Sequence, residues 1–226
     1  MKVLAINASP RKNANTATLL EHALQGALSQ GAQGELVHLY DLDFKGCVSC
    51  FACKRKGNAC NGLCAVQDSL TDVLRAALGS DVLLMGTPIY FGDVTGGLRS
   101  FLERLLFPIL TYNADRRRAR EVTIAAGLLF TMNAPQEYCV TGYRELMEKH
   151  QGLLRLLGGG SETLACCDTW QFRDYSLFEA SGIDEARKAR VRAEQFPQDC
   201  RRAFELGARL TIQRQELLSK KKERWK

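Results

Sequence analysis

Cysteines are concentrated in one short stretch of this chain: five of its nine cysteines lie between residues 45 and 66. Their spacing is C-x2-C-x2-C-x6-C-x3-C, from Cys47 through Cys50, Cys53 and Cys60 to Cys64. Three thiols at two-residue intervals let one tight loop present three sulfurs, as an iron–sulfur cluster requires, although the usual Cys-Pro ending is missing. A C-x2-C pair also suits Zn²⁺. The stretch therefore predicts a [4Fe–4S] loop, a zinc site or a loop that holds no metal.

Disulfides do not explain these thiols. The total of nine cysteines is odd, whereas a disulfide framework needs pairs. Residues 1–7 carry one basic side chain and too short an apolar run for a secretory signal peptide. The sequence therefore predicts a cytoplasmic protein whose thiols stay reduced.

The polar turn ASPRKNANT, at residues 8–16, suits a different ligand. Ser9, Asn15 and Thr16 supply short polar side chains, and Arg11 supplies a guanidinium group. A helix is predicted to begin here, and the free N–H groups and the dipole of its first turn favour an anion. Both G-x-x-x-x-G-K-[ST] and G-x-G-x-x-G are missing. The turn therefore predicts a phosphate monoester site, and not a nucleoside triphosphate or dinucleotide site.

The stretch TPIYFG, further along the chain, suits a flat ring. Pro88 keeps the backbone extended, and Gly92 permits a sharp turn. Between them, Ile89, Tyr90 and Phe91 offer apolar surface beside backbone amides. A tricyclic aromatic ligand with a polar edge would use both features.

Strand and helix patterns alternate five times around these turns. Asp68 is predicted to cap the second helix and Pro108 to end the third, while Pro197 is predicted to kink the last. The predicted strands cover residues 2–7, 35–40, 81–86, 122–130 and 162–167, and the predicted helices cover 16–30, 68–77, 98–107, 143–157 (ended by Gly158-Gly159-Gly160) and 184–219.

This alternation predicts an α/β fold, because parallel strands need long right-handed crossovers. Five units fit a flavodoxin-like three-layer sandwich with a five-stranded parallel sheet in the order 2-1-3-4-5. Residues 1–226 are predicted to form a single domain with a cysteine-rich loop (45–66) and a C-terminal helical extension (184–226). A ligand is expected where strands 1 and 3 diverge, at the turns that begin at Ala8 and Thr87. The cysteine-rich loop leaves the neighbouring strand, so its thiols are expected near the same site.

The net charge of +6 is unevenly placed. Basic residues gather at 116–120 and 220–226, where a solvated turn and a helix end explain them. A nucleic-acid surface would also need interleaved aromatic residues, which these clusters lack. No apolar run approaches the roughly 20 residues of a membrane span. The sequence therefore predicts neither nucleic-acid binding nor a membrane span.

Four motifs in this order resemble the NADPH-dependent FMN reductase and iron–sulfur flavoprotein family. The resemblance covers most of the first 110 residues, and the later segment Asp174-Tyr175-Ser176 resembles part of a subgroup of flavodoxin-like oxidoreductases. The four motifs are Ser9-Pro10-Arg11-Lys12 with Asn15-Thr16, Cys47-x-x-Cys50-x-x-Cys53-Lys54, Thr87-Pro88-Ile89-Tyr90-Phe91-Gly92 and Phe101-Leu102-Glu103-Arg104.

The resemblance implies which residues bind FMN. It implies a homodimer or homotetramer, for which the stripe Phe101, Leu102, Leu105, Leu106 and Phe107 is either an interface or a core-facing surface. The implied contacts are Ser9, Arg11, Asn13, Asn15 and Thr16 at the phosphate, Pro88, Ile89, Tyr90, Phe91 and Gly92 around the isoalloxazine, and Thr131 and Asn133 on its other side.

The implied function is that of an FMN-dependent oxidoreductase, which moves electrons from NAD(P)H through FMN to a quinone, a flavin, an azo or nitro compound, or a protein. No acid–base side chain is needed for this chemistry, and His22, His38 and His150 are interpreted as structural or surface residues. One alternative is an electron-transfer iron–sulfur flavoprotein with a [4Fe–4S] cluster on Cys47, Cys50, Cys53 and Cys64, with Cys60 as a rival fourth ligand. A distant alternative is a zinc-stabilised binding module without enzyme activity.

Overall fold

Five parallel strands form the sheet of the computed structural model, which describes residues 1–57, 60–115 and 118–223. Their order is β2-β1-β3-β5-β6, so the predicted order 2-1-3-4-5 is confirmed. A short additional strand, β4, pairs antiparallel with the end of β3. The strands are β1 (Lys2–Asn7), β2 (Gln33–His38), β3 (Val82–Tyr90), β4 (Asp93–Val94), β5 (Ile124–Thr131) and β6 (Gly158–Cys166).

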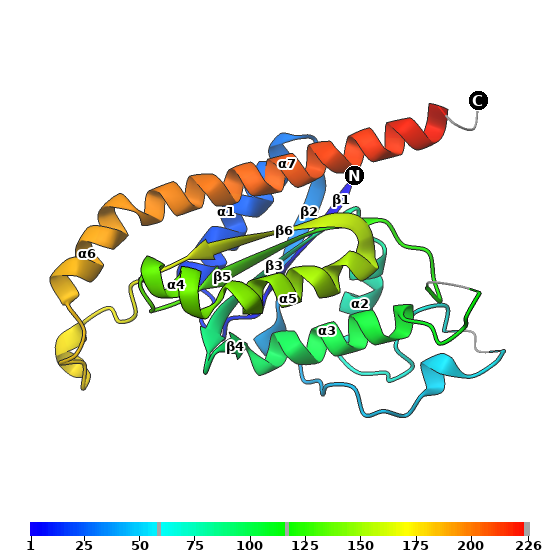
Figure 1. The fold of residues 1–226 in the computed structure, drawn as a ribbon, viewed down its shortest axis with the longest axis horizontal. Helices are drawn as coiled ribbons and strands as arrows, with labels where there is room; N and C mark the ends of the chain where they lie inside the picture. The colour runs from blue at the N-terminus through cyan, green and yellow to red at the C-terminus, as the bar shows by residue number, and fades with distance from the viewer. Residues whose placement is uncertain (58–59, 116–117, 224–226) are drawn as a thin grey trace.

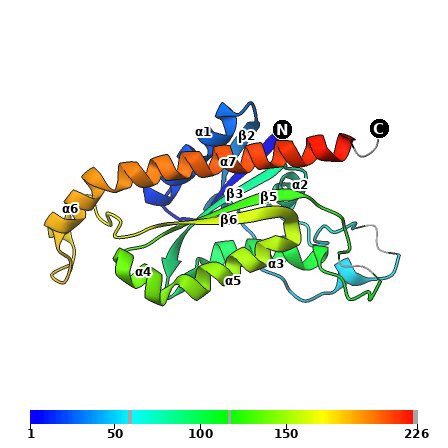
Figure 2. The same ribbon diagram turned by 45° about the horizontal axis from the view of Figure 1, so that its top comes forward.

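Helices cover both faces of this sheet, as Figures 1 and 2 show. One face carries α1 and α7, and the other carries α2, α3 and α5. Among the described residues, none of the helices combines the length and the apolar composition of a membrane span. The helices are α1 (Asn15–Ser29), α2 (Thr71–Leu78), α3 (Gly96–Ile109), α4 (Gln136–Gly142), α5 (Arg144–Leu154), α6 (Glu185–Glu194) and α7 (Phe196–Glu223), with short 3-10 turns at Leu39–Asp41, Ala52–Lys54, Arg155–Leu157 and Tyr175–Leu177.

The central strands β1, β3 and β5 are largely buried on both faces of the sheet because their side chains are mostly apolar on both faces. In β1, Val3 and Ala5 contact the core under α1 and α7, whereas Leu4 and Ile6 contact the core under α2, α3 and α5. All eight residues of β5 are buried. Continuous apolar strands of this kind are typical of parallel sheets between two helical layers.

Parts of three predicted features lie outside the described residues. They are residues 58 and 59 of the cysteine-rich loop, Arg116 and Arg117 of the basic turn, and residues 224–226 of the basic tail.

The prediction that Asp68 caps the second helix is wrong. α2 begins at Thr71 with Leu70 at its N-cap position, and no side chain caps it. The Asp68 carboxylate accepts a hydrogen bond from the backbone N–H of Leu70 at 3.0 Å and forms an ion pair with Arg104. The buried Arg104 guanidinium group requires a carboxylate partner. Asp68 supplies it and therefore contacts α3, and does not cap α2.

Pro108 does not end α3, which continues to Ile109. Proline removes one N–H group and therefore one helical hydrogen bond. The ammonium group of Lys54, from the cysteine-rich loop, donates hydrogen bonds to the carbonyl groups of Phe107 and Leu110 at this end of α3. α3 can therefore include a proline in its last turn, where the carbonyl groups of Phe107 and Leu110 accept hydrogen bonds from Lys54.

Two other predicted helices are divided. The helix predicted at 143–157 is α5 followed by a 3-10 turn, and Gly158, with a φ of 77°, begins β6 directly after that turn. The helix predicted at 184–219 is interrupted at Gln195. Pro197 lies in the first turn of α7, where its missing N–H group costs no helical hydrogen bond.

α7 crosses α1 at very short range, through two glycines. A Cβ atom on Gly207 of α7 would overlap the backbone carbonyl group of Ala23, and a Cβ atom on Gly26 of α1 would overlap that of Phe204. Because both overlaps involve backbone atoms, neither can be relieved by a side-chain rotation. The absence of a side chain at both positions therefore sets how closely the two helices approach.

Replacing Gly207 with Ala should destabilise the protein, because the added methyl group forces α1 and α7 apart. We expect the free energy of unfolding, measured by urea titration, to fall by about 1–3 kcal/mol. Gly152→Ala is a matched control in α5, where a Cβ atom would meet no neighbour, so we expect a gain of up to about 1 kcal/mol. A Gly207→Ala protein as stable as the wild type would contradict this account of the contact.

Candidate functional site

A cavity of about 200 Å³ lies where the carboxyl ends of the central strands meet. This is the edge at which the sequence predicted a ligand, since the chain leaves β1 and β3 in opposite directions there. The residues that line it are Ser9, Arg11, Ala14, Asn15 and Thr16 after β1, Pro88, Ile89 and Tyr90 at the end of β3, Thr131, Met132 and Asn133 at the end of β5, and Thr169 and Gln171 after β6.

The turn after β1 is shaped to receive an anion. The Ser9 N–H group donates to the Asn7 carboxamide oxygen at 3.0 Å, and the Arg11 N–H group donates to Ser9 Oγ at 3.2 Å. α1 begins at Asn15 with Ala14 at its N-cap position, and no side chain accepts from the N–H groups of its first turn. Those N–H groups and the positive end of the helix dipole therefore remain available to a ligand.

Two buried threonines hold the strand ends together around this turn. Thr16 Oγ1 lies 2.8 Å from Thr131 Oγ1, so a hydrogen bond joins the first turn of α1 to the end of β5. Thr95 Oγ1 donates to the carbonyl group of Ala8 at 2.9 Å and accepts from the N–H group of Leu98, which caps α3. The turn after β1 is thus fixed to β5 on one side and to α3 on the other.

A hairpin at the end of β3 forms the opposite wall of the cavity. Tyr90 pairs with Asp93, and the two residues between them have positive φ angles, 48° at Phe91 and 80° at Gly92. This is the geometry of a tight type I′ turn, which glycine adopts readily and phenylalanine does not. The Phe91 side chain is fully exposed. Of the predicted ring-binding segment, Pro88, Ile89 and Tyr90 line the cavity, whereas Phe91 and Gly92 only shape its rim.

A segment that the sequence analysis did not assign to the site closes the cavity. This strap, residues 168–173, follows β6 and crosses to the turn after β1. Arg11 Nη1 donates to the carbonyl oxygen of Gln171 at 2.6 Å, and Asn15 Nδ2 donates to that of Trp170 at 2.7 Å. The sequence analysis did not predict the strap because, in a sheet of this order, a ligand is expected where the first and third strands diverge and not after the last strand.

The base of the strap is held by buried charges. Asp168 forms ion pairs with Lys188 at 2.5 Å and Arg187 at 2.9 Å, and the Lys188 ammonium group also donates to the carbonyl oxygen of Asn133 at 2.9 Å. Burial alone would raise the pKa of Asp168, but the hydrogen bonds from Lys188 and Arg187 hold this pKa below its usual value. These contacts join the turn after β5, the strap and α6 into one unit.

The remaining predicted residues lie away from the cavity. Asn13 lines a neighbouring cavity. His38 Nδ1 lies 2.9 Å from the Asn7 carboxamide nitrogen, His150 is fully buried beside Phe130, and His22 is exposed. None of the three histidines is among the residues that line the cavity.

The stripe proposed as a subunit interface faces the core. Phe101, Leu102, Leu105 and Leu106 are all buried within the chain. Of the two interpretations of this stripe, the core-facing one therefore describes these four residues.

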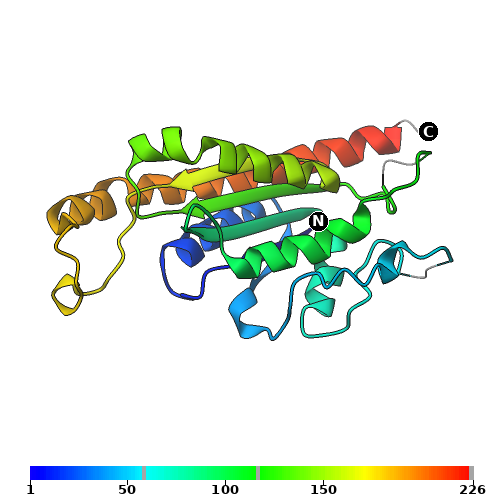
Figure 3. The same ribbon diagram turned by 60° about the horizontal axis from the view of Figure 1, so that its bottom comes forward.

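The cysteine-rich loop runs beside α3 (Figure 3), and charged side chains of α3 hold it there. The buried Arg104 guanidinium group donates to the carbonyl oxygens of Lys45 at 3.2 Å and Val66 at 2.9 Å, and pairs with Asp68. The neighbouring Glu103 carboxylate accepts a hydrogen bond from the Cys47 N–H group at 3.2 Å. Both ends of the loop are therefore fixed to one turn of α3.

The thiols of this loop do not form a ready metal site. Cys47 and Cys50 are exposed, while Cys53, Cys60 and Cys64 are half-buried. Burial raises the pKa of the Cys53 thiol, as does negative charge on Cys64, Cys50 and Cys47, although Lys54 opposes the shift. Among the described residues, no three His, Cys, Asp or Glu side chains are grouped closely enough to hold a metal ion. In this arrangement the thiols do not fit a cluster or zinc.

A family model described as NADPH-dependent FMN reductase matches residues 1–131. An iron–sulfur flavoprotein of Archaeoglobus fulgidus is 34% identical over 128 residues, covering 57% of this chain and 60% of the relative. An iron–sulfur flavoprotein of Methanocaldococcus jannaschii is 32% identical over 104 residues, covering 46% of this chain and 51% of the relative. The chain thus spans between half and about three-fifths of the length of these two relatives.

Solved structures share the fold at lower identity. An NAD(P)H:quinone oxidoreductase from Methanothermobacter marburgensis superposes with a TM-score of 0.63 and 19% identity, covering 93% of this chain and 96% of that one. An azoreductase from Bacillus anthracis superposes with a TM-score of 0.61 and 14% identity, covering 92% of this chain and 99% of that one. These likenesses establish the flavodoxin-like architecture.

Replacing Arg104 with Lys should release the cysteine-rich loop, because an ammonium group cannot reach Lys45, Val66 and Asp68 together. Loss of hydrogen bonds to a buried charge costs about 1.5–3 kcal/mol locally, so we expect Cys64 to be alkylated at least about tenfold faster. Mass spectrometry of the labelled peptides measures this rate. Arg75→Lys, in an exposed pair with Asp72, is the control. Equal Cys64 labelling in wild type and Arg104→Lys would show that Arg104 does not hold the loop.

Proposed function

Because the chain belongs to the NADPH-dependent FMN reductase family, we propose that it is an FMN-dependent oxidoreductase that passes electrons from NAD(P)H to an acceptor. One observation carries this proposal: the cavity at the carboxyl edge combines an uncapped helix start at one end with the Tyr90 hairpin at the other. A phosphate ester joined to a flat ring has the same two ends. The residues present therefore fit FMN.

The phosphate end is assigned to Ser9, Arg11, Asn15 and Thr16. Their side chains surround the first-turn N–H groups of α1, which would donate to the phosphate oxygens. The Ser9 hydroxyl group keeps its proton free to donate, because its oxygen accepts from the Arg11 N–H group. Asn13 is left out of this set, since it lines the neighbouring cavity.

The ring end is assigned to the hairpin and to the turn after β5. Pro88, Ile89 and Tyr90 offer an apolar wall, and the segment from Thr131 to Asn133 offers backbone groups opposite it. Bound FMN supplies the redox chemistry, since a flavin accepts a hydride and returns electrons singly or in pairs. The chain orients the ring and covers one side of it. Its half-exposed Tyr90 leaves the rim open to a nicotinamide donor and then to an acceptor.

The acceptor is assigned only by class. An open ring end is consistent with a quinone, a flavin, an azo or nitro compound or a protein as the acceptor. Two proteins that share the fold are named as a quinone oxidoreductase and an azoreductase. A cytoplasmic location and a homodimeric or homotetrameric assembly remain predictions.

An iron–sulfur centre in the cysteine-rich loop is the second candidate. The curated relatives are named iron–sulfur flavoproteins. Cys53 lies close enough to Cys47, Cys50 and Cys64 to be influenced by their charges, and Lys54 would favour an anionic cluster. The present arrangement does not gather the sulfurs, so cluster binding requires the loop to rearrange between its fixed ends. We derive no electron-transfer step through it.

The double variant Arg11→Ala/Thr16→Val tests the phosphate assignment. It removes a charged donor and a hydroxyl group, each worth about 1–3 kcal/mol, so FMN affinity in a fluorescence titration should fall at least about tenfold. Arg75→Ala/Thr141→Val makes the same changes at exposed sites and should bind FMN like the wild type. Circular dichroism confirms that both variants fold. Unchanged affinity in a folded Arg11→Ala/Thr16→Val protein would refute the assignment.

Serine substitutions separate the two rival cluster ligands. If the loop binds iron, Cys64→Ser should lose it and Cys60→Ser should keep it, because Cys64 influences the charge environment of Cys53 and lies next to the segment 66–68 that Arg104 fixes. Iron per protein after anaerobic purification measures the outcome. The reverse order would exchange the two ligands, and a wild type without iron would remove the cluster from the proposal.

A further inference from the structure

The side chain of His150, in α5, is fully buried and contacts two walls of the proposed FMN cavity. Its ring packs at 74° to the ring of Phe130, with the two centroids 6.2 Å apart. Phe130 directly precedes Thr131, which lines the cavity at the end of β5. The Nε2 atom of His150 lies 3.5 Å from the carboxylate of Asp93, in the hairpin at the end of β3. The imidazole therefore joins the end of β5 to this hairpin.

Only one of the two ring nitrogens has a hydrogen-bond partner among the described residues. Nδ1 of His150 lies 2.9 Å from the carbonyl oxygen of Leu146, which can only accept, so Nδ1 carries a hydrogen. Nε2 is buried and has no such partner. In a neutral imidazole Nε2 is then a bare acceptor that faces the Asp93 carboxylate, whereas in a protonated imidazole it can donate to that carboxylate. The contact is thus repulsive or attractive according to the charge of the ring.

Asp93 transmits this contact to the wall of the cavity. It pairs with Tyr90 across the tight turn, and its carboxylate also accepts from the Val94 N–H group at 2.8 Å. Tyr90 lines the cavity at the proposed ring end. The base of the hairpin is fixed, because the Thr95 N–H group donates to Thr87 Oγ1 at 3.2 Å, but β4 itself contains only two residues. A force on the Asp93 side chain therefore acts on the tip that carries Tyr90.

Lys149 is the other charged side chain at Asp93. Its Nζ atom lies 3.6 Å from Asp93 Oδ2, and both side chains are about half exposed. Water and salt screen such a pair, so it contributes little to the position of the hairpin. Among the described residues, no further ion pair involves Asp93 or His150, and the β5 side of the ring is the apolar Phe130. The buried contact with His150 is therefore the stronger anchor of the hairpin when the imidazole is charged.

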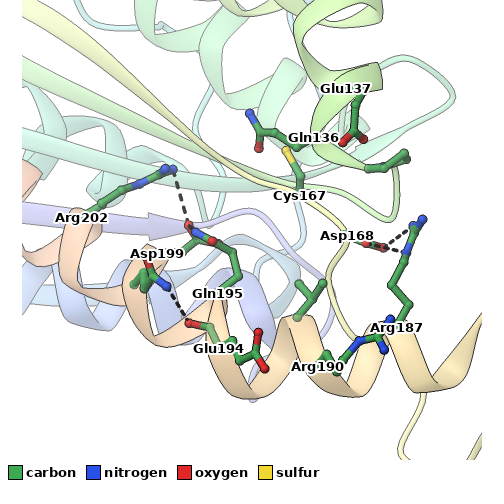
Figure 4. A pocket seen from close by; sticks show the side chains of 13 residues that line it. Gln136, Glu137, Cys167, Asp168, Arg187, Arg190, Glu194, Gln195, Asp199 and Arg202 are labelled. Carbon is green, nitrogen blue, oxygen red and sulfur yellow. Dashed lines mark hydrogen bonds and ion pairs between the residues drawn. The ribbon is translucent and has the colours of Figure 1, made fainter.

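The strap is held by groups of a different kind. Asp168, at its base, pairs with Arg187 at 2.9 Å (Figure 4) and with Lys188 at 2.5 Å. A guanidinium group does not lose its proton in proteins, so the pair with Arg187 keeps its charge near neutral pH. Histidine, by contrast, is the ordinary side chain whose charge changes between about pH 5 and 8. The anchor of the hairpin therefore depends on a proton, whereas the pair with Arg187 at the base of the strap does not.

We propose that His150 is a positioning residue for the ring end of the site. Its protonated imidazole donates from Nε2 to Asp93 and holds the Tyr90 hairpin against the flavin ring. Loss of that proton to water leaves two acceptors facing each other, and the tip of the hairpin moves away from the ring. The inference rests on the proposed function, and it adds a proton-dependent control of how firmly the ring is bound. Flavin binding therefore strengthens as the pH falls and weakens as the pH rises.

Fluorescence titration of FMN between about pH 5.5 and about pH 8 tests this role. His150→Gln places a neutral amide beside Asp93, so this contact no longer depends on pH. The ratio of wild-type affinity to His150→Gln affinity should fall about tenfold as the pH rises across this range, and the ratio cancels the titration of the FMN phosphate. His22→Gln, at an exposed position of α1, should bind FMN like the wild type at each pH. Equal pH profiles of the wild type and His150→Gln would overturn the proposal.

Asp93→Asn tests the same contact from the hairpin, at a side chain that is half exposed. An amide can donate to the bare Nε2 atom of His150 at any pH, so Asp93→Asn should show the same pH profile as His150→Gln. Lys149→Gln removes the exposed pair and should keep the wild-type profile. Circular dichroism confirms that the variants fold. A folded Asp93→Asn protein with the wild-type profile, or a Lys149→Gln protein that loses it, would count against His150 as the anchor.

Nuclear magnetic resonance of the full chain without FMN separates this inference from the proposed function. The ring nitrogens of His150 should show the Nδ1–H tautomer at high pH and two N–H groups at low pH. The backbone amide signals of Tyr90 and Gly92 should shift with the same midpoint, and signals that do not follow the ring would refute the coupling. A protein whose hairpin follows His150 but which binds no FMN would refute the proposed function and not the coupling.

Discussion

The ion pairs of Asp168 connect the walls of the site. Asp168 follows β6 directly, and it draws Lys188 and Arg187 of α6 against the end of the sheet. Lys188 then holds the carbonyl group of Asn133, so one buried ammonium group determines the position of the turn after β5. Breaking a buried pair of this kind leaves an uncompensated charge, which costs several kcal/mol. The strap, the turn after β5 and α6 are therefore coupled, so that a structural change in one of them displaces the others.

The sequence predicted the strand order and seven of the cavity residues from local patterns, whereas Thr131 and Asn133 came only from the family resemblance. Alternating strands and helices specify a parallel sheet, and the polar turn around Ser9 and the extended segment at Pro88 come directly after its strands. The strap was missed because it binds Arg11 and Asn15 through backbone carbonyl groups, which any residue could supply. Asp68 was misassigned for a related reason: its partner, Arg104, lies on a different helix.

The cysteine-rich loop is held in place at its two ends by contacts with α3. Arg104 and Glu103 hold its two ends on α3, so the cost of closing the loop is met by protein contacts and not by a metal. The thiols between those ends remain separate in this arrangement. The two ends of the loop can therefore keep their positions while the segment between them rearranges, because Arg104 and Glu103 hold these ends through backbone groups and the Asp68 carboxylate.

The glycine contact between α1 and α7 has a consequence for biosynthesis. α1 follows the turn after β1 that lines the cavity, yet α1 is covered by α7, near the other end of the described chain. A ribosome makes a chain at about 5–20 residues per second, N-terminus first, so α1 emerges many seconds before its partner. Until α7 follows, the apolar side of α1 and one face of the sheet lie open to water or to chaperones. The turn after β1, although it is translated long before α7, can reach its final rigidity only after α7 has been made and has packed against α1.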